Sequence, residues 1–164
     1  MNISRGIILS APSSASGKTT ITLGLLRALK IAGIPVRSAK SGPDYIDPRF
    51  HAAASGAECF NLDAWAMSPD SIRMLASGAH PLIIEGAMGL FDGALPYGKG
   101  STADLARILG LPIVLVLDVA SQAQSVAAVA LGFSQLAPDI KIAGLILNKV
   151  ASPRHNRMLC TALE

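Results

Sequence analysis

The sequence predicts an α/β fold in which a mainly parallel sheet is flanked by helices. Short apolar runs alternate with longer amphipathic segments along the chain, which is the sequence form of repeated βα units. A glycine- and lysine-containing loop joins the first apolar run to the first amphipathic segment, and carboxylates follow later runs. At 164 residues the length favours a single domain spanning residues 1–164.

Five short runs are predicted to form the strands of this sheet. They are GIILSA (6–11), VRSAK (36–40), PLIIE (81–85), PIVLVLD (112–118) and IAGLILN (142–148). The segments between them are predicted helices. Residues 19–33 place Ile21, Leu25, Leu29 and Ala32 on one face and end near Gly33. Further helix starts are indicated at Ser68-Pro69, at Ser101 with Asp104, at Ser121 with Gln124, and at Ser152-Pro153.

Two long connections, residues 41–67 and 86–100, follow the carboxyl ends of predicted strands. In open α/β sheets ligands bind in the crevice outside those ends. We therefore expect the functional residues to lie in these two connections and in the loop after the first strand.

The stretch SAPSSASGKTT (10–20) predicts a phosphate-binding loop. Gly17, Lys18 and Thr19 match the pattern G-x-x-x-x-G-K-[ST], whereas Pro12 replaces its first glycine. Such a loop needs backbone N–H groups at a helix N-terminus, a lysine for phosphate oxygens and a hydroxyl for Mg²⁺. Residues 16–20, including Ser16 and Thr20, can supply these groups. The alternative is a solvated turn that happens to contain Gly-Lys-Thr.

Lys40 ends the second predicted strand and is followed by Asp44 and Asp47. We expect the two carboxylates to help hold Mg²⁺ or to orient a nucleophile, and Lys40 to face substrate or phosphate oxygens. The alternative for Asp47 is an N-cap of a helix that has Pro48 at its first position.

Glu85 ends the third predicted strand, where nucleotide-binding α/β proteins place an acidic partner of Mg²⁺. A purely structural carboxylate is the alternative.

Asp92 lies in the following loop, near Ser101 and Thr102, and is predicted to contact metal or substrate, or else to form a turn with Gly93.

Asn148 and Lys149 end the last predicted strand, where a base-binding loop is expected. Guanine-specific proteins follow Asn-Lys with an aspartate two residues on, and Ala151 stands at that position. Adenine is therefore the predicted base.

Tyr45 and Trp65 are candidates for a substrate site or for the core. The histidines show no metal-ligand spacing, so His51, His80 and His155 are treated as ordinary surface or packing residues.

Composition limits the classes of function. A net charge of +3 with scattered Lys and Arg argues against a nucleic-acid surface. No apolar run reaches the roughly 18 residues of a membrane span, and the N-terminus lacks a signal peptide, so we expect a cytoplasmic protein with no membrane partner. Cys59 and Cys160 indicate neither a disulfide framework nor a zinc site.

Together these residues resemble the N-terminal synthetase domain of the cobyrinic acid a,c-diamide synthases. The resemblance runs in order through nearly the whole chain, and its most specific blocks are GPDYIDP (42–48) and EGAMGLFDG (85–93). It implies a fold similar to dethiobiotin synthetase and an ATP- and Mg²⁺-dependent amidation of two acetate carboxylates of a corrinoid acid, through an acyl phosphate. The ammonia would come from glutamine.

The resemblance also implies roles by matching position. Lys18 and Thr19 would contact phosphate and metal, and Glu85 would be the metal carboxylate. Asp44, Tyr45, Asp47 and Asp92 would lie at the reacting carboxylate. Family members continue into a glutaminase domain with a nucleophilic cysteine, and neither Cys59 nor Cys160 has that context. We therefore expect a chain truncated at its C-terminal end, and a homodimer is one state that the sequence leaves open.

Two rival families fit less well. A partitioning or division-site ATPase switch would carry a lysine five positions before Lys18, where Ser13 stands. A dethiobiotin-type carboxylate-activating synthetase would begin its loop with Gly-Thr, where this chain has Pro12-Ser13.

Overall fold

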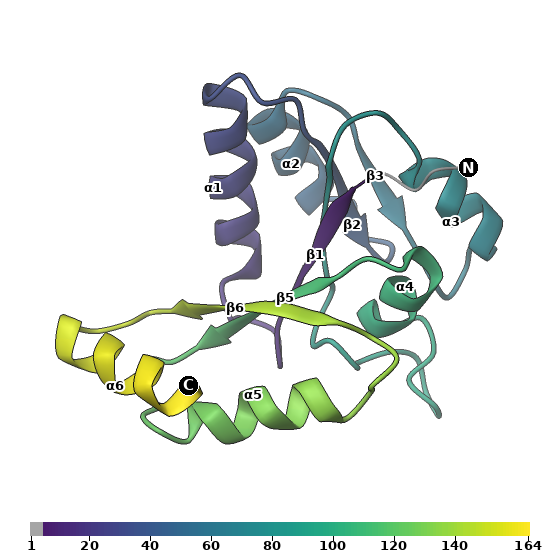
Figure 1. Cartoon of the computed structure of the whole chain (residues 1–164). Coiled ribbons are helices and arrows are strands. Elements are labelled where there is room, and N and C mark those ends of the chain that lie inside the picture. The colour runs from purple at the N-terminus through teal and green to yellow at the C-terminus, as the bar shows by residue number, and fades with distance from the viewer. Residues whose placement is uncertain (1–4) are drawn as a thin grey trace.

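The computed structural model describes residues 5–164, in which strands and helices alternate strictly along the chain (Figure 1). The elements are β1 (Gly6–Ser10), α1 (Lys18–Ile31), β2 (Arg37–Ser41), α2 (Asp47–Ser55), β3 (Cys59–Leu62), α3 (Pro69–Ala76), β4 (Leu82–Glu85), α4 (Thr102–Leu109), β5 (Ile113–Asp118), α5 (Val126–Gln135), β6 (Ile142–Asn148) and α6 (Pro153–Leu163). The predicted α/β class is confirmed.

The described strands form one six-stranded sheet in the order β3-β2-β4-β1-β5-β6, and every neighbouring pair is parallel. All carboxyl ends therefore lie at the same edge of the sheet. The register places Glu85 of β4 opposite Leu9 of β1 on one side and opposite Lys40 of β2 on the other. The carboxyl-terminal ends of three neighbouring strands thus meet beside the loop that leads into α1.

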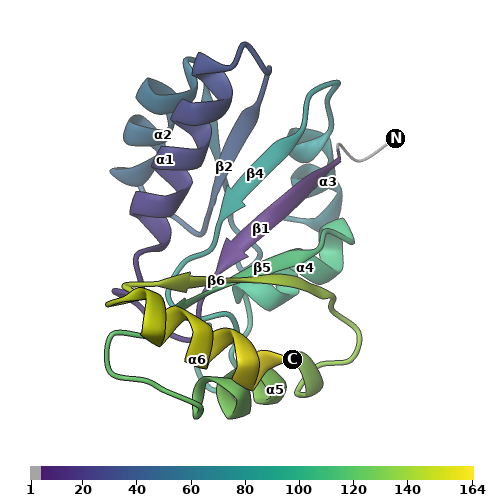
Figure 2. The same ribbon diagram turned by 60° about the vertical axis from the view of Figure 1, so that its left-hand side comes forward.

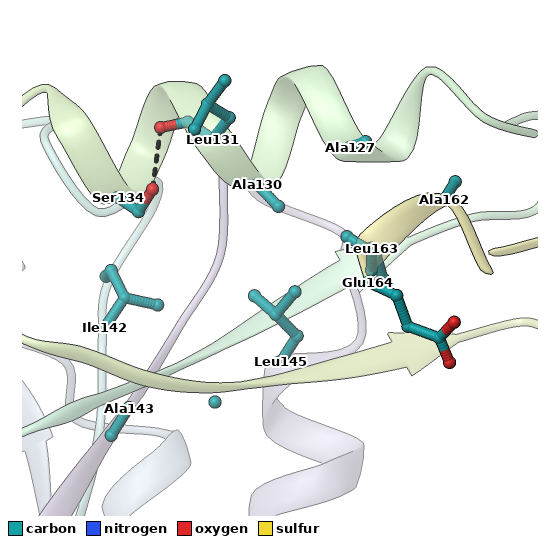
Figure 3. Close-up of a pocket in the computed structure, with 11 residues that line it drawn as sticks. Ala127, Ala130, Leu131, Ser134, Ile142, Ala143, Leu145, Ala162, Leu163 and Glu164 are labelled. Atoms are coloured by element: carbon teal, nitrogen blue, oxygen red, sulfur yellow. Dashed lines mark hydrogen bonds between the residues drawn. The ribbon is translucent and has the colours of Figure 1, made fainter. Parts of the chain in front are cut away.

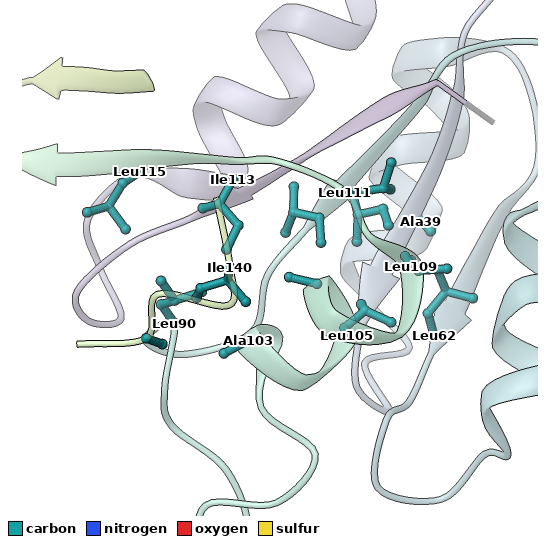
Figure 4. Close-up of a cluster of buried hydrophobic side chains, with 14 of the residues drawn as sticks. Ala39, Leu62, Leu90, Ala103, Leu105, Leu109, Leu111, Ile113, Leu115 and Ile140 are labelled. Atoms are coloured by element: carbon teal, nitrogen blue, oxygen red, sulfur yellow. The ribbon is translucent and has the colours of Figure 1, made fainter. Parts of the chain in front are cut away.

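Helices cover both faces of this sheet, as Figure 2 shows. On one face, α1 and α2 cover a small cluster that includes Leu9, Leu26 and Ile83. On the other, α3 to α6 cover a larger cluster, part of which is drawn in Figure 4, with Leu105, Ile113 and Leu115 fully buried. Burying a leucine or isoleucine side chain contributes roughly 1.5–3 kcal/mol. The two cores hold the strand ends, and hence the site, in fixed register.

The five predicted strands are confirmed, with boundaries within one or two residues. The helix starts at Ser68, Ser101 and Ser152 are also confirmed, since each of these hydroxyls accepts a backbone N–H bond of the first helical turn. The capping box of Ser101 and Asp104 is complete.

Two predictions about elements are wrong. The helix predicted from Ser121 begins only at Val126, because the carbonyl of Gln122 is held by the Nε2 atom of His155 in a turn before it, at 2.8 Å. The connection 41–67 is not a continuous loop, because it contains α2 and the edge strand β3. That strand has only four residues, CFNL, which is too short for its pattern to be distinctive.

A groove of about 500 Å³ lies between α5, α6 and β6 (Figure 3). It is lined by small and apolar residues such as Ala130, Leu131 and Leu145, and it lies beside the first half of β6 rather than at the strand's carboxyl end. It is therefore separate from the residues that the sequence singles out. Of the helices that the structure describes, none combines the length and the apolar character needed to cross a bilayer.

Candidate nucleotide and metal site

The loop between β1 and α1 adopts the strand–loop–helix geometry that its sequence predicts. Ala15 and Gly17 both have positive φ, of 62° and 93°, so the backbone turns sharply before α1 begins at Lys18. A Cβ on Gly17 would lie 2.2 Å from the Nδ2 atom of Asn148, which donates a hydrogen bond to the carbonyl of Ser16 at 2.9 Å. Gly17 is thus required both by its conformation and by the space it occupies.

The side chain of Lys18 lies folded across this loop. Its ammonium group donates to the carbonyl of Ser13 at 3.0 Å and to the carbonyl of Met88 at 2.6 Å. Met88 itself has a positive φ of 49°, unusual for a side chain of this size, and this conformation belongs to the loop that follows β4. Burial lowers the pKa of Lys18, while Glu85 and Asp92 act in the opposite direction.

Glu85 connects the phosphate-loop helix to the neighbouring strand. Its Oε1 atom accepts from the hydroxyl of Thr19 at 2.5 Å and from the ammonium of Lys40 at 2.7 Å. Lys40 also donates to the Oδ2 atom of Asp47 at 2.6 Å. The structure therefore brings together Thr19, Lys40, Asp47 and Glu85, which lie far apart in the sequence, in one cluster in which Lys40 and Glu85 are buried and the other two are half-buried.

His51 is the residue that the sequence analysis missed. Its side chain is completely buried, with Nε2 2.7 Å from the Oε2 atom of Glu85 and Nδ1 3.5 Å from the sulfur of Cys59. The available signal was its place on the helix that Asp47 begins, since one helical turn separates His51 from Asp47. Treating all three histidines alike discarded that signal.

The charges in this cluster offset the cost of burial. Desolvation alone would raise the pKa of Glu85, but hydrogen bonds from His51, Lys40 and Thr19 lower that pKa to about 2. Desolvation likewise opposes the charged form of Lys40, yet its bonds to Asp47 and Glu85 raise its pKa overall. Burial would lower the pKa of His51, and its bonds to Cys59 and Glu85 raise it to about 9. Each buried charge is thus paired, as burial requires.

The helix-capping alternative gave the capping role to Asp47, but in the structure Asp44 has that role. Asp47 is the first residue of α2 and gives its carboxylate to Lys40, whereas Ile46 occupies the N-cap position. The Oδ1 atom of Asp44 accepts from the backbone N–H groups of Ile46 and Asp47, at 2.8 and 3.1 Å, so it is Asp44 that satisfies the helix terminus. These hydrogen bonds lower its pKa despite partial burial.

Asp92 and Thr102 line a second, smaller cavity of about 210 Å³ beside the cluster. The Oδ2 atom of Asp92 accepts from the backbone N–H of Gly89 at 2.8 Å, a turn contact made with Gly89 rather than with Gly93. Trp65 and Met88 contribute apolar surface to the same cavity. Ser101 is next to it in sequence but is 4 % exposed and uses its hydroxyl to cap α4.

Other predicted site residues lie at the margins of the cluster. Ser16 is buried in the phosphate loop, where its hydroxyl donates to the carbonyl of Ser13 at 3.0 Å. Thr20 is exposed on the first turn of α1. Tyr45 is 83 % exposed and lines a separate cavity of about 370 Å³ between α2 and β3.

The arrangement fits a magnesium-bound nucleoside phosphate. The hydroxyl of Thr19 and the carboxylate of Glu85 are oxygen ligands of the kind that Mg²⁺ prefers. Across residues 5–164, no group of three or more His, Cys, Asp or Glu side chains is placed to hold a metal.

Comparison with known protein families gives a match over residues 7–164 to the CbiA family, described as the CobQ/CobB/MinD/ParA nucleotide binding domain. The chain belongs to this family. The observed phosphate loop, with Lys18 and Thr19 at the start of α1, is the part of the CbiA domain expected to bind the nucleotide.

Curated relatives in the CbiA family are similar over almost the whole chain. A hydrogenobyrinate a,c-diamide synthase from Brucella anthropi is 59% identical over 165 residues, which cover 98% of this chain and 38% of that protein. A protein of the same name from Rhodobacter capsulatus is 54% identical over 166 residues, with the same coverage. The chain thus spans 38% of the length of these relatives.

Solved structures confirm the fold alone. Chloroplast FtsY from Physcomitrella patens matches with a TM-score of 0.66 at 18% identity, covering 99% of this chain and 55% of that one. Signal recognition particle 54 kDa protein from Aeropyrum pernix, in complex with GDP, matches with a TM-score of 0.59 at 17% identity, covering 99% of this chain and 39% of that one. The predicted P-loop NTPase-like architecture is confirmed.

Proposed function

We propose that this domain catalyses the ATP- and Mg²⁺-dependent amidation of the a- and c-acetate carboxylates of hydrogenobyrinic or cobyrinic acid, in cobalamin biosynthesis. The observation that carries the proposal is the cluster of Lys18, Thr19, Lys40 and Glu85 at the carboxyl ends of β1, β2 and β4. The printed name of the relatives, hydrogenobyrinate a,c-diamide synthase, supplies the substrate class.

The reaction proceeds in two displacements. A carboxylate oxygen of the corrinoid acid attacks the γ-phosphorus of ATP, the bond to the bridging oxygen breaks, and ADP leaves. The nitrogen of ammonia then attacks the carbonyl carbon of the acyl phosphate, the bond from that carbon to the phosphate oxygen breaks, and the proton lost by the nitrogen is taken up by the departing inorganic phosphate. Each carboxylate is converted to an amide in this way, at the cost of one ATP.

The phosphate loop holds the nucleotide in this scheme. Backbone N–H groups at the start of α1 and the ammonium of Lys18 bind the phosphate oxygens. To do so, Lys18 exchanges its contacts with the carbonyls of Ser13 and Met88 for phosphate oxygens. Ser16, Gly17 and Thr20 complete the loop around the phosphates.

Thr19 and Glu85 would hold the magnesium ion, with Asp44 as a further candidate ligand. When bound, Mg²⁺ neutralises charge on the β- and γ-phosphates. Glu85 is suited to this because its pKa of about 2 keeps it ionised across the physiological range.

The acceptor carboxylate would lie beside Lys40, Asp47 and Asp92. Lys40 offers a buried positive charge to the attacking carboxylate and the transferring phosphoryl group. The cavity beside it combines apolar walls with Thr102 and Asp92, which suits an acetate side chain carried on an apolar macrocycle. Tyr45 is a further candidate on the substrate side, whereas Ser101, which the sequence also placed there, uses its hydroxyl to cap α4.

Adenine is the proposed base because Ala151 stands where guanine-specific proteins have an aspartate. Asn148 joins the base-proximal end of β6 to the phosphate loop through its bond to Ser16. Calorimetric titration with Mg·ATP and Mg·GTP decides this point, and GTP binding as tight as ATP binding would contradict it.

The remaining parts of the proposal concern partners and place. Ammonia would come from glutamine, through a glutaminase domain for which the greater length of the relatives leaves room. We propose a cytoplasmic enzyme, and a homodimer as a state to be tested by light scattering.

The reaction is tested by incubating the chain with hydrogenobyrinic acid, Mg·ATP and an ammonium salt. We expect amide products by mass spectrometry and one phosphate released for each amide formed, with cobyrinic acid as a parallel substrate. Lys18→Ala should abolish both signals while the circular dichroism spectrum is retained. ATP hydrolysis that is unaffected by either corrinoid acid would instead favour an ATPase switch.

A further inference from the structure

His51 lies in a helix that covers the sheet, and its side chain links Glu85 of β4 to Cys59 of β3. It lies on α2, and its imidazole bridges the carboxylate at the end of β4 and the thiol at the start of β3. Its exposed fraction is 0%. A buried imidazole with a polar partner on each nitrogen has a fixed orientation, because rotation of the ring would leave both partners unsatisfied.

The carboxylate of Glu85 uses its two oxygens differently. Oε1 accepts from Thr19 and Lys40, whereas Oε2 lies 2.7 Å from the Nε2 atom of His51. The hydrogen bond at Oε2 restricts rotation of the carboxylate about its Cγ–Cδ bond, and so favours the orientation in which Oε1 faces Thr19 and Lys40. His51 therefore bonds the carboxylate oxygen of Glu85 that does not face Thr19.

We propose that His51 is a positioning residue, which orients the carboxylate of Glu85 toward Thr19 for the magnesium ion of the bound nucleotide, and that Cys59 orients the imidazole in turn. This rests on the proposed Mg·nucleotide site. Outer hydrogen-bond partners of metal-binding side chains are known to change metal affinity about 10–100-fold when they are removed.

The competing explanation is that His51 only fills space between α2 and the sheet. The two explanations differ in what a substitution changes. A packing role predicts lower stability with an unchanged magnesium requirement, whereas a positioning role predicts a higher magnesium requirement in a folded protein.

The test is a magnesium titration of nucleotide binding with purified His51→Leu and His51→Gln, followed by calorimetry or a fluorescent ATP analogue. His51→Leu should raise the Mg²⁺ concentration needed for half-maximal binding about tenfold or more, while binding in EDTA is unchanged. The amide nitrogen of glutamine reaches toward the place of Nε2, so His51→Gln should restore most of the wild-type dependence.

Two further variants keep the test decisive. If His51→Leu fails to fold, His51→Asn replaces it, because the shorter amide occupies the place of Nδ1 and should not restore the bond to Glu85. Ile72→Ala, in a fully buried position of α3 on the opposite face, serves as the matched control. It should lower the melting temperature and leave the magnesium dependence as in the wild type.

A folded His51→Leu or His51→Asn variant with wild-type magnesium dependence would overturn the inference, as would a glutamine variant no better than leucine. Because no corrinoid is present, the titration tests the inference separately from amidation. A His51-dependent magnesium requirement in a protein that forms no amide would contradict only the proposed reaction.

Discussion

At the scale of single residues, Gly17 is the position where a side chain is least compatible with the structure. Its φ of 93° is unfavourable for any L-residue, and a Cβ would displace the amide of Asn148 from the phosphate loop. Asn148 is in turn the residue that attaches the loop to the end of β6. A side chain at Gly17 would therefore disturb both the conformation of the loop and its hydrogen bond to Asn148.

We expect Gly17→Ala to lower the free energy of unfolding by about 1–2 kcal/mol, from left-handed strain, and to weaken nucleotide binding. Gly24→Ala is the matched control, in the helix α1 that Gly17 precedes, because a Cβ at Gly24 would have no atom of another element within 4 Å. The control should raise stability by about 0.5–1 kcal/mol, since alanine favours helix over glycine. Urea unfolding and calorimetry measure the two effects, and similar behaviour of the two variants would contradict the assignment.

The buried pair of His51 and Glu85 predicts a dependence of stability on pH. The pKa of His51 is raised from 6.5 to about 9, so its contribution is complete below pH 6.5 and is lost as pH rises through 9. The pKa of Glu85 is lowered from 4.5 to about 2, so its contribution is present above pH 4.5 and is lost as pH falls toward 2.

Unfolding in urea, with EDTA present, should therefore give a free energy that declines from pH 6.5 to 9 in the wild type. His51→Gln should be flatter over that range, because no imidazole titrates there. Cys59→Ser controls for the thiol that faces the same imidazole. An equal decline in His51→Gln and the wild type would refute this account.

At the scale of elements, two neighbouring hydroxyl residues at the start of α4 have different surroundings. Ser101 caps the helix with Asp104, whereas the neighbouring Thr102 lines the cavity of about 210 Å³. The two hydroxyls are adjacent in sequence, yet one is committed to a helix terminus and the other lies at the candidate substrate site.

Ser101→Ala should lower the free energy of unfolding by about 1 kcal/mol, the usual cost of losing an N-cap, with little change in KM for the corrinoid acid. Thr102→Val should show the reverse pattern, because it keeps the volume and removes only the hydroxyl. Thermal unfolding and steady-state kinetics distinguish them. A raised KM for Ser101→Ala without a loss of stability would place Ser101 in direct contact with substrate.

At the scale of the whole molecule, folding gives Cys59 a partner that the sequence does not reveal. The sequence shows no exposed turn around it, yet folding brings the imidazole of His51 within 3.5 Å of its sulfur. Cys59 nevertheless begins strand β3, and the imidazole already bonds Glu85 of the candidate metal site. The thiol of Cys59 therefore contacts a side chain that bonds Glu85 of the candidate nucleotide site.

We therefore expect these residues to release no glutamate from glutamine, since a glutaminase needs a nucleophilic cysteine exposed beside its base. The measurement is glutamate formation with glutamine alone, compared with Cys59→Ala and Cys160→Ala. Glutamate above background that disappears with Cys59→Ala would show that the thiol is catalytic.

The sequence by itself determined the class of fold and the phosphate loop. Alternating apolar and amphipathic runs fixed five of the strands, and local signals fixed the helix starts at Ser68, Ser101 and Ser152, because caps and periodicity act over a few neighbouring residues. Lys18 and Thr19 were recognisable for the same reason. The residues of the predicted phosphate-binding loop are contiguous in the chain.

Only the tertiary structure decided how the distant residues combine. The register of β1, β2 and β4 brings Glu85 to Lys40 and Thr19, and the packing of α2 on the sheet adds His51. The edge strand β3 and the late start of α5 were likewise set by contacts with β2 and with His155. These interactions join residues far apart in the chain, and local sequence patterns carry no information about which distant group will satisfy a buried charge.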